Sequence, residues 1–301
     1  MENKFHDVIF RTQLLESLDK KGIKCVTPIS PDYPENLKHT DEPPLVLYCK
    51  GNVSLLKSNC FSVVGSRRTS PQALALCKKI CGELTEAFTV VTGMAEGADS
   101  AAIEGALPSG KVISVLANGF DYFYPATNKS LIERVAREGL LISEYLPHIL
   151  PLKYNFPVRN RIIAGLSRGT LVVSAGEKSG ALITADFALE YGREVFAFPY
   201  NAGTASGAGC NALIKNGAYL TENILDILEV FGLDLKKSER AESLTEDEAA
   251  LLNEIKLTGE GFLPGIAQKL NKFTYQLIPV AVSLEIKGLI VRLGGNRYGI
   301  V

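Results

Sequence analysis

Short apolar runs alternate with stretches of helical periodicity through the middle of the chain. Each of seven runs predicts a buried strand: 61–64, 88–92, 111–117, 140–144, 170–174, 194–199 and 218–221. Strands that are apolar throughout are typical of a parallel sheet covered on both faces. Helices are predicted between or after them, from Pro71 with Ser70 as its cap and near 129–138, 158–167, 179–191 and 210–216. The alternation predicts a doubly wound α/β domain over residues 51–232.

Polar and proline-rich segments divide the rest of the chain. Residues 1–50 hold one amphipathic helix and a proline-rich approach, and we expect an N-terminal extension that packs on the core. Residues 233–243 are polar and charged and are predicted to be a linker. Residues 244–301 predict a small C-terminal winged-helix domain, with helices at 246–256, 263–271 and 274–287 and a hairpin around Gly294. The six acidic and six basic residues of this domain favour a protein contact over groove reading.

The composition is that of a globular protein and contains no metal or cofactor motif. Apolar residues make up 46% and charged residues 22% of the 301 residues. No signal peptide is predicted, and the uncharged run 195–214 would be a poor membrane span, so we expect no membrane contact. Six cysteines without a CxxC pair suggest reduced thiols in a cytoplasmic protein. No P-loop occurs and the GAGCNA run at 207–212 is a weak dinucleotide match, so we predict no metal and no cofactor.

Glycines and hydroxyl residues follow the ends of several predicted strands. These loops are 65–68, 92–99, 118–119, 174–176 and 179–181. Ligands of an open parallel sheet bind beyond the carboxyl ends of its strands, and exposed N–H groups at helix starts suit phosphate. For any single loop, glycines that merely permit a tight turn are the better explanation. For several loops on one edge, together with Arg67 and Arg68, phosphate binding is the stronger hypothesis.

The distribution of charge is more informative than its total. A net charge of -1 argues against a uniformly basic surface. However, residues 43–82 contain six basic residues and no acidic one, and residues 145–176 contain four basic residues and no acidic one. The second window interleaves its cations with Tyr154 and Phe156, a pairing that suits the phosphates and unstacked bases of single-stranded nucleic acid.

Ordinary structural roles for the same side chains stay open at this point. Tyr154 and Phe156 could each be core residues. The arginines of the second window could also pair with carboxylates of the sheet, which we expect of one arginine rather than of both. The residues concerned are Arg159, Arg161, Asp99 and Glu144.

A series of motifs resembles the DNA-processing protein A (DprA/Smf) family. The runs VVGSRRTS, TGMAEGADSAAIEGAL, FDYFYPATN, FPVRNRIIAGLS, SGALITADFALEYGREVFAFP and GCNALIKNGA stand in that family's order, and LEIKGLI with GGNRYGI looks like its winged-helix tail. The resemblance implies an extended Rossmann-like domain that binds single-stranded DNA. It also implies a homodimer that protects incoming DNA and loads a RecA-type recombinase in natural transformation.

The resemblance further implies which residues bind single-stranded DNA. They are the GSR loop with its next residue (Gly65, Ser66, Arg67, Arg68), a basic and stacking pair (Lys153, Phe156), the RNR motif (Arg159, Asn160, Arg161) and the pocket rim (Ser179, Gly180, Asn211, Lys215). Several positions depart from the family's usual residues, and one of them is Tyr200, which follows Pro199 where the family usually has glycine. Glu96 stands in place of arginine, Ile103 in place of histidine and Ser174 in place of glutamate.

Two other functions compete with single-stranded DNA binding. A divergent nucleotide-binding protein or nucleotide hydrolase could use Glu96, Asp99 and Glu144 as acid and base, although we expect these carboxylates to cap helices or pair with arginines. A protein-interaction module acting through the winged helix would retain no DNA. We favour a non-catalytic DNA-binding recombination mediator and predict no catalytic residue.

Overall fold

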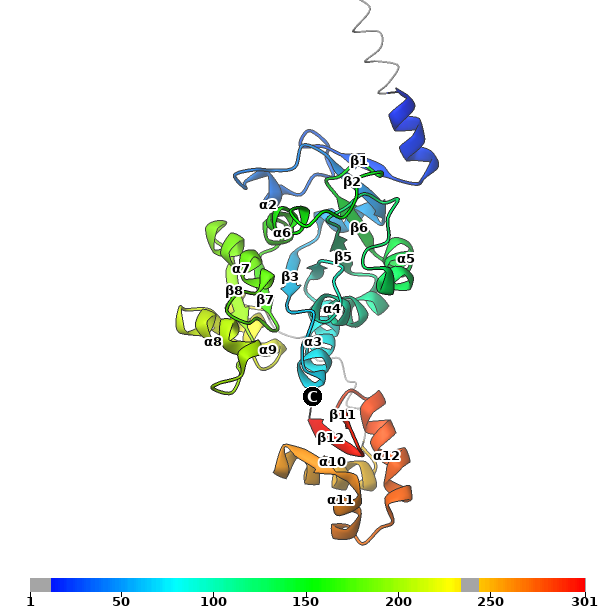
Figure 1. Cartoon of the computed structure of the whole chain (residues 1–301), viewed down its shortest axis with the longest axis vertical. Coiled ribbons are helices and arrows are strands. Elements are labelled where there is room, and N and C mark those ends of the chain that lie inside the picture. Colours follow the sequence, from blue (N-terminus) through cyan, green and yellow to red (C-terminus); the bar gives the residue numbers. More distant parts are fainter. Residues whose placement is uncertain (1–11, 234–243, 301) are drawn as a thin grey trace, which may run out of the picture.

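A nine-stranded sheet forms the centre of the molecule (Figure 1). The computed structural model describes residues 12–233 and 244–300. The strands lie in the order β1-β2-β6-β5-β4-β3-β7-β8-β9. Their bounds are β1 (Lys24–Val26), β2 (Leu47–Gly51), β3 (Cys60–Val64), β4 (Thr89–Thr92), β5 (Val112–Val115), β6 (Leu140–Ser143), β7 (Gly169–Val172), β8 (Glu194–Ala197) and β9 (Tyr219–Leu220). Strands β3 to β9 are parallel, which confirms the predicted doubly wound, Rossmann-like α/β class with a mainly parallel sheet.

The order of the strands reverses beside β3. From β3 the chain moves outward through β4, β5 and β6, and it then returns to place β7, β8 and β9 on the other side of β3. Helices that leave the sheet on opposite faces at such a point leave a crevice beyond the carboxyl ends of the two strands. The carboxyl ends of β3 and β7 are therefore where a ligand site is expected.

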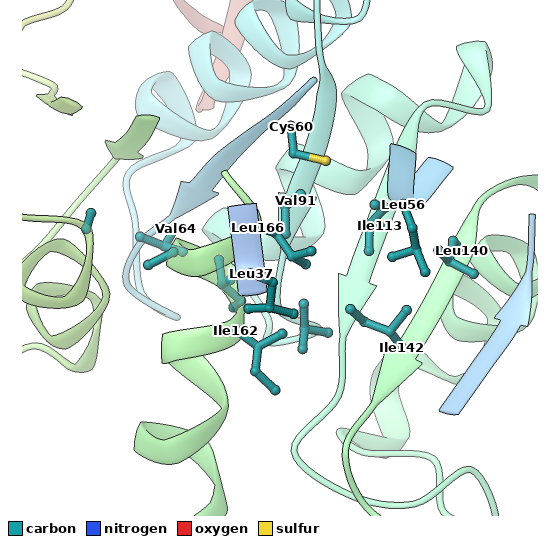
Figure 2. Close-up of a cluster of buried hydrophobic side chains, with 14 of the residues drawn as sticks. Leu37, Leu56, Cys60, Val64, Val91, Ile113, Leu140, Ile142, Ile162 and Leu166 are labelled. Atoms are coloured by element: carbon teal, nitrogen blue, oxygen red, sulfur yellow. The ribbon is translucent and has the colours of Figure 1, made fainter. Parts of the chain in front are cut away.

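Helices cover both faces of the sheet and enclose two apolar cores. One face carries α3 (Pro71–Leu84), α4 (Ala98–Ala106), α5 (Lys129–Glu138) and α9 (Ile224–Val230). The other carries α2 (Glu35–Lys38), α6 (Asn155–Leu166), α7 (Gly180–Glu190) and α8 (Ala208–Lys215). Figure 2 shows this second core, in which Ile162 and Leu166 of α6 meet strand residues such as Ile113. Short 3-10 turns occupy Val53–Lys57, Leu107–Ser109, Ala126–Asn128 and Ala205–Gly207.

The N-terminal extension adds two strands to the sheet. Residues 12–20 are helical, β1 pairs antiparallel with β2, and β2 pairs antiparallel with β6. The short α2 lies against α6, where a side chain on Gly165 would crowd Leu37 and Thr40 at 2.8 and 2.9 Å. The sheet thus begins before residue 51, the predicted start of the α/β domain, and neither β1, at the edge of the sheet, nor β2, beside it, was predicted.

The C-terminal segment forms a separate small unit. It contains α10 (Glu246–Thr258), α11 (Leu263–Lys269), α12 (Thr274–Ile286) and a three-stranded sheet of β10 (Glu260–Phe262), β11 (Ile290–Gly294) and β12 (Arg297–Ile300). Its apolar core contains Leu251, Leu277 and Tyr298. In Figure 1 it lies next to α3, which β11 contacts. Most of the predicted linker, residues 234–243, lies outside the described residues.

Candidate nucleic-acid interface

A groove of about 420 Å³ opens at the switch point of the sheet. Its walls come from the loop after β3, from α6 and from the start of α7. It brings together nine of the thirteen predicted site residues: Gly65, Ser66, Arg67, Arg68, Phe156, Arg159, Asn160, Ser179 and Gly180. These residues are separated by up to 115 positions in the chain, and the parallel strands carry them to one edge.

The loop after β3 is held in place by its own hydrogen bonds. The Ser66 N–H donates to the Ser174 carbonyl oxygen at 2.9 Å, and the Ser66 hydroxyl oxygen accepts from the Arg68 N–H at 3.1 Å. Gly97 lies close beneath the loop with φ +79°, and a Cβ there would stand 2.5 Å from the Ser66 carbonyl oxygen. Arg67 and Arg68 are exposed, and neither makes an ion pair within the described residues. Two cations are therefore free at the mouth of the groove.

Arg159 lies at the base of the groove rather than at its surface. It is 6% exposed, and its guanidinium donates to the Val115 carbonyl oxygen and, through Nε, to Asn160 Oδ1 at 3.2 Å. It faces Asp99, which is equally buried and accepts from the Ala95 N–H at 3.1 Å. Burial raises the pKa of Asp99 and lowers the pKa of Arg159, and each charge opposes the other's shift. Arg159 thus acts first as the counter-charge of a buried carboxylate.

Arg161 turns away from the groove. Its Nη2 lies 2.6 Å from Glu144 Oε2, and both side chains are largely buried. Burial raises the pKa of Glu144, an effect that Arg161 opposes. Within the described residues Arg161 forms an ion pair with Glu144 and Arg159 forms none, which confirms the expectation that one of the two arginines rather than both would pair with a carboxylate. The helix turns Arg161 toward Glu144, whereas the Arg159 guanidinium donates to the Val115 carbonyl oxygen and only faces Asp99.

Three further predicted residues also lie outside the groove. Lys153 is exposed in the loop before α6 and lines none of the described cavities around the site. Asn211 is structural, since its Nδ2 donates to the Tyr200 carbonyl oxygen at 2.8 Å and its Oδ1 accepts from the Tyr200 N–H at 3.0 Å. Asn211 and Lys215 line a different depression, formed by α8 and the loop after β8.

Phe156 forms a partly exposed aromatic wall of the groove. Its ring lies 5.3 Å from the Tyr124 ring, and the Arg67 guanidinium stands 6.0 Å from its centroid. The same ring also borders a smaller, more closed cavity beneath Tyr124. Tyr154 is 68% exposed, so the core alternative does not hold for it. Tyr124 was not among the predicted site residues, although the aromatic run FDYFYPATN was the signal that could have found it.

The start of α7 closes the groove on the far side. The Ser179 hydroxyl oxygen accepts from the Ala181 N–H at 3.3 Å and caps the helix. Asn160 reaches across from α6, and its Nδ2 donates to the Gly180 carbonyl oxygen at 3.2 Å. The N-terminal end of an eleven-residue helix thus points its partial positive charge at the space between Arg67 and Phe156.

A family model described as DNA recombination-mediator protein A matches residues 24–232, more than half of the chain. The chain belongs to this family.

Relatives of the mediator family agree with this assignment. The DNA processing protein DprA of Streptococcus pneumoniae is 43% identical over 200 residues, which cover 66% of this chain and 71% of that protein. The X-ray structure of the pneumococcal protein is similar with a TM-score of 0.67 at 41% identity, covering 69% of this chain and 74% of that one. A structure of the Helicobacter pylori protein, reported for its single-stranded DNA binding mode, has a TM-score of 0.63 at 29% identity and covers 69% and 95%.

Three of the departures from the mediator family's usual residues, at Glu96, Ile103 and Ser174, differ in their surroundings. Ile103 is fully buried in the core between α4 and the sheet. Ser174 is also buried, and its hydroxyl donates to the Ser206 carbonyl oxygen at 3.4 Å. Glu96 is exposed, lines the smaller cavity and accepts from the Thr127 hydroxyl at 2.6 Å. Of the three, Glu96 is the one that faces the candidate site.

The described residues hold neither a cluster of metal ligands nor a helix that could cross a bilayer. Residues 12–233 and 244–300 contain no group of three or more His, Cys, Asp or Glu side chains that could hold a metal ion. Within the same residues, every helix is too short or too polar to span a bilayer.

Proposed function

We propose that this chain is a single-stranded DNA-binding recombination mediator without catalytic activity. It protects incoming strands in the cytoplasm and loads a RecA-type recombinase on them during natural transformation. The observation that carries the proposal is the groove at the switch point, where two unpaired arginines stand beside a partly exposed phenylalanine. The reported binding mode of the H. pylori relative supports it.

The groove supplies the two kinds of contact that a single strand needs. Arg67 and Arg68, with the N–H groups that open α7, suit backbone phosphates. The Phe156 ring offers a face on which an unstacked base can lie, and the Arg67 guanidinium keeps a cation over that ring. Stacking tolerates every base, so binding depends little on sequence.

The carboxylates near the groove are occupied, which supports a binding role rather than hydrolysis. Asp99 holds the Ala95 N–H and faces Arg159, and Glu144 is paired with Arg161. Glu96 accepts a hydrogen bond from Thr127. A general acid and base pair requires a carboxyl group free to exchange its proton with a substrate.

Fluorescence anisotropy with a labelled oligothymidylate tests the proposal. The double variant Arg67→Ala/Arg68→Ala should make the slope of log affinity against log salt about 1.4 less negative. Between 50 and 200 mM salt, its affinity should therefore fall about sevenfold less than that of the unmodified protein. Phe156→Ala should cost about 1–3 kcal/mol of binding. The matched control is Lys79→Ala, which removes an exposed cation of α3. Unchanged affinity in both groove variants, or equally tight binding of duplex DNA, would overturn the proposal.

We propose that the homodimer forms through the β9 edge of the sheet. Tyr219 and Leu220 are 42% and 46% exposed there, and the nearby Leu225 is 57% exposed. An open strand edge with apolar side chains favours pairing with a second copy. Light scattering should show a dimer for the unmodified chain and a monomer for Leu220→Asp. The exposed Leu45 provides the control, because Leu45→Asp should leave the dimer intact.

We propose that the C-terminal unit contacts a protein, which is also what its equal numbers of acidic and basic residues favour. The exposed face of α12 is an apolar stripe made of Tyr275, Ile278, Val282 and Ile286. Such a face suits a protein surface better than phosphates. Ile278→Asp/Ile286→Asp should leave oligonucleotide affinity unchanged and abolish stimulation of recombinase-driven strand exchange. Unchanged stimulation would contradict a contact between α12 and the recombinase.

A further inference from the structure

We propose that the single-stranded DNA track continues from the groove across Phe156 and Tyr124 to a second base platform formed by Phe123 and Lys129. The inference rests on the proposed function and extends the site beyond the residues to which the family resemblance assigned DNA binding. Phe123 and Lys129 lie in the loop between β5 and α5 and at the first position of α5.

A series of cations and rings leads out of the groove. The Arg67 guanidinium stands 6.0 Å from the centroid of Phe156, and the Phe156 ring lies 5.3 Å from that of Tyr124. Phe123 is the chain neighbour of Tyr124, and the Lys129 ammonium stands 5.1 Å from the Phe123 ring. The series therefore begins and ends with a cation held over an aromatic ring, the arrangement that serves phosphates and bases together.

The loop that carries these rings is pinned on both sides. Asp121 forms an ion pair with Lys21 at 2.6 Å, and its N–H donates to the Pro147 carbonyl oxygen at 3.0 Å. At the other end of the loop, Asn128 Nδ2 donates to the Met94 carbonyl oxygen at 3.0 Å. Phe123 is nevertheless 43% exposed. A phenylalanine kept in water by a fixed loop suits a platform, because no ordering of the loop is needed when a base arrives.

The charges of the loop favour nucleic acid over a protein partner. The carboxylate of Asp121 is neutralised by Lys21, and Lys129 makes no ion pair within the described residues. Glu96, the nearest acid of the smaller cavity, is engaged by Thr127. A surface that docks a protein would not need the Lys129 ammonium over the exposed Phe123 ring. It would also not need to lie next to the rings that border the groove.

Oligonucleotide length tests the longer track. The unmodified protein is compared with Phe123→Ala and Lys129→Ala on a short and a long oligothymidylate, of about 6 and 15 nucleotides. Each variant should bind the short oligonucleotide unchanged, because the groove fills first. Phe123→Ala should bind the long one about 5- to 150-fold more weakly, the range expected for one lost stacked base. Phe123→Trp, which keeps an aromatic ring at this position, should bind the long oligonucleotide as tightly as the unmodified protein. Tyr275→Ala, which removes an exposed ring of the C-terminal unit, should also leave that affinity unchanged.

The outcomes separate this inference from the proposed function. Equal loss on both lengths would overturn the longer track, because the loop would then only support the groove. Unchanged binding of the long oligonucleotide by Phe123→Ala would overturn it as well. Failure of the unmodified protein to bind either length would instead refute the proposed function.

Discussion

The buried pair of Arg159 and Asp99 yields a prediction that separates folding from DNA binding. Arg159→Met keeps most of the side-chain volume and removes the charge. Asp99, which is 6% exposed, then keeps its hydrogen bond from the Ala95 N–H but loses the positive charge of Arg159 that faces it. Leaving a buried charge without its counter-charge costs about 3–5 kcal/mol. We therefore expect Arg159→Met to lower the free energy of unfolding by that amount, whether or not DNA is present.

The assay is urea unfolding, followed by far-UV circular dichroism and tyrosine fluorescence, because the chain contains 11 tyrosines and no tryptophan. Arg159→Met/Asp99→Asn supplies the second arm. Asparagine can still accept from the Ala95 N–H and carries no charge, so the double variant should recover most of the lost stability. Such recovery shows that the cost comes from the uncompensated carboxylate.

The pH dependence of the same variant has a definite sign. Burial raises the pKa of Asp99, and Arg159 opposes that shift, so removing Arg159 raises the pKa further. A carboxyl group with a raised pKa favours folding while it is protonated and penalises it as pH rises through that pKa. The deficit of Arg159→Met should therefore be larger at pH 8 than near pH 4. If Arg159→Met is as stable as the unmodified protein at pH 8 and loses only DNA binding, the guanidinium is a phosphate ligand and our reasoning is wrong.

Three further predictions concern single positions. Glu96→Arg replaces an acid beside the track with a cation, so anisotropy should show tighter binding at low salt and a salt slope steeper by about 0.7. The pKa of Glu248 is lowered to about 2 because Ser283, Lys287 and the Thr245 N–H donate to it; its stabilising effect is present above its ordinary pKa and fades as pH falls toward 2. In thermal unfolding, Glu248→Gln should reduce the fall of stability that the unmodified protein shows as pH falls, whereas Glu246→Gln, at an exposed position, should leave that fall unchanged. In Gly105→Ala the new Cβ would clash with the Lys78 carbonyl oxygen, so the free energy of unfolding measured in urea should fall by about 1–3 kcal/mol. In the control, Gly82→Ala, the new Cβ makes only an ordinary van der Waals contact, and no such fall is expected.

The fold was largely predictable because burial leaves a clear pattern. The helix expected at 129–138 has those bounds, and the strand expected at 61–64 begins one residue earlier, at Cys60. Strands β1 and β2 were missed because they are short or follow prolines, and the pairing of β2 with β6 depends on contacts distant in sequence. β10 has three residues and was missed for the same reason.

The sequence predicted which loops form the site, but not which way every side chain of the site points. The carboxyl-end loops were found because a parallel sheet must gather them at one edge. The direction of each side chain on α6 was not available from the sequence, since neighbouring positions on a helix point about 100° apart. Arg161 was therefore placed in the groove, although it turns to Glu144. Asn211 was misplaced similarly, because its partner Tyr200 is eleven residues away across a turn.

The RNR segment of α6 determines whether the protein or the DNA loses more conformational entropy on binding. Arg159 anchors the helix to the sheet, Asn160 ties it to α7, and Arg161 ties it to Glu144 at the end of β6. The groove wall is thus complete before any strand arrives, and the protein loses little conformational entropy when it binds. That loss falls on the DNA instead. A strand whose bases are already loose, such as oligothymidylate, should be preferred over one that must first unstack, and the stiffness of the ligand becomes a form of selectivity.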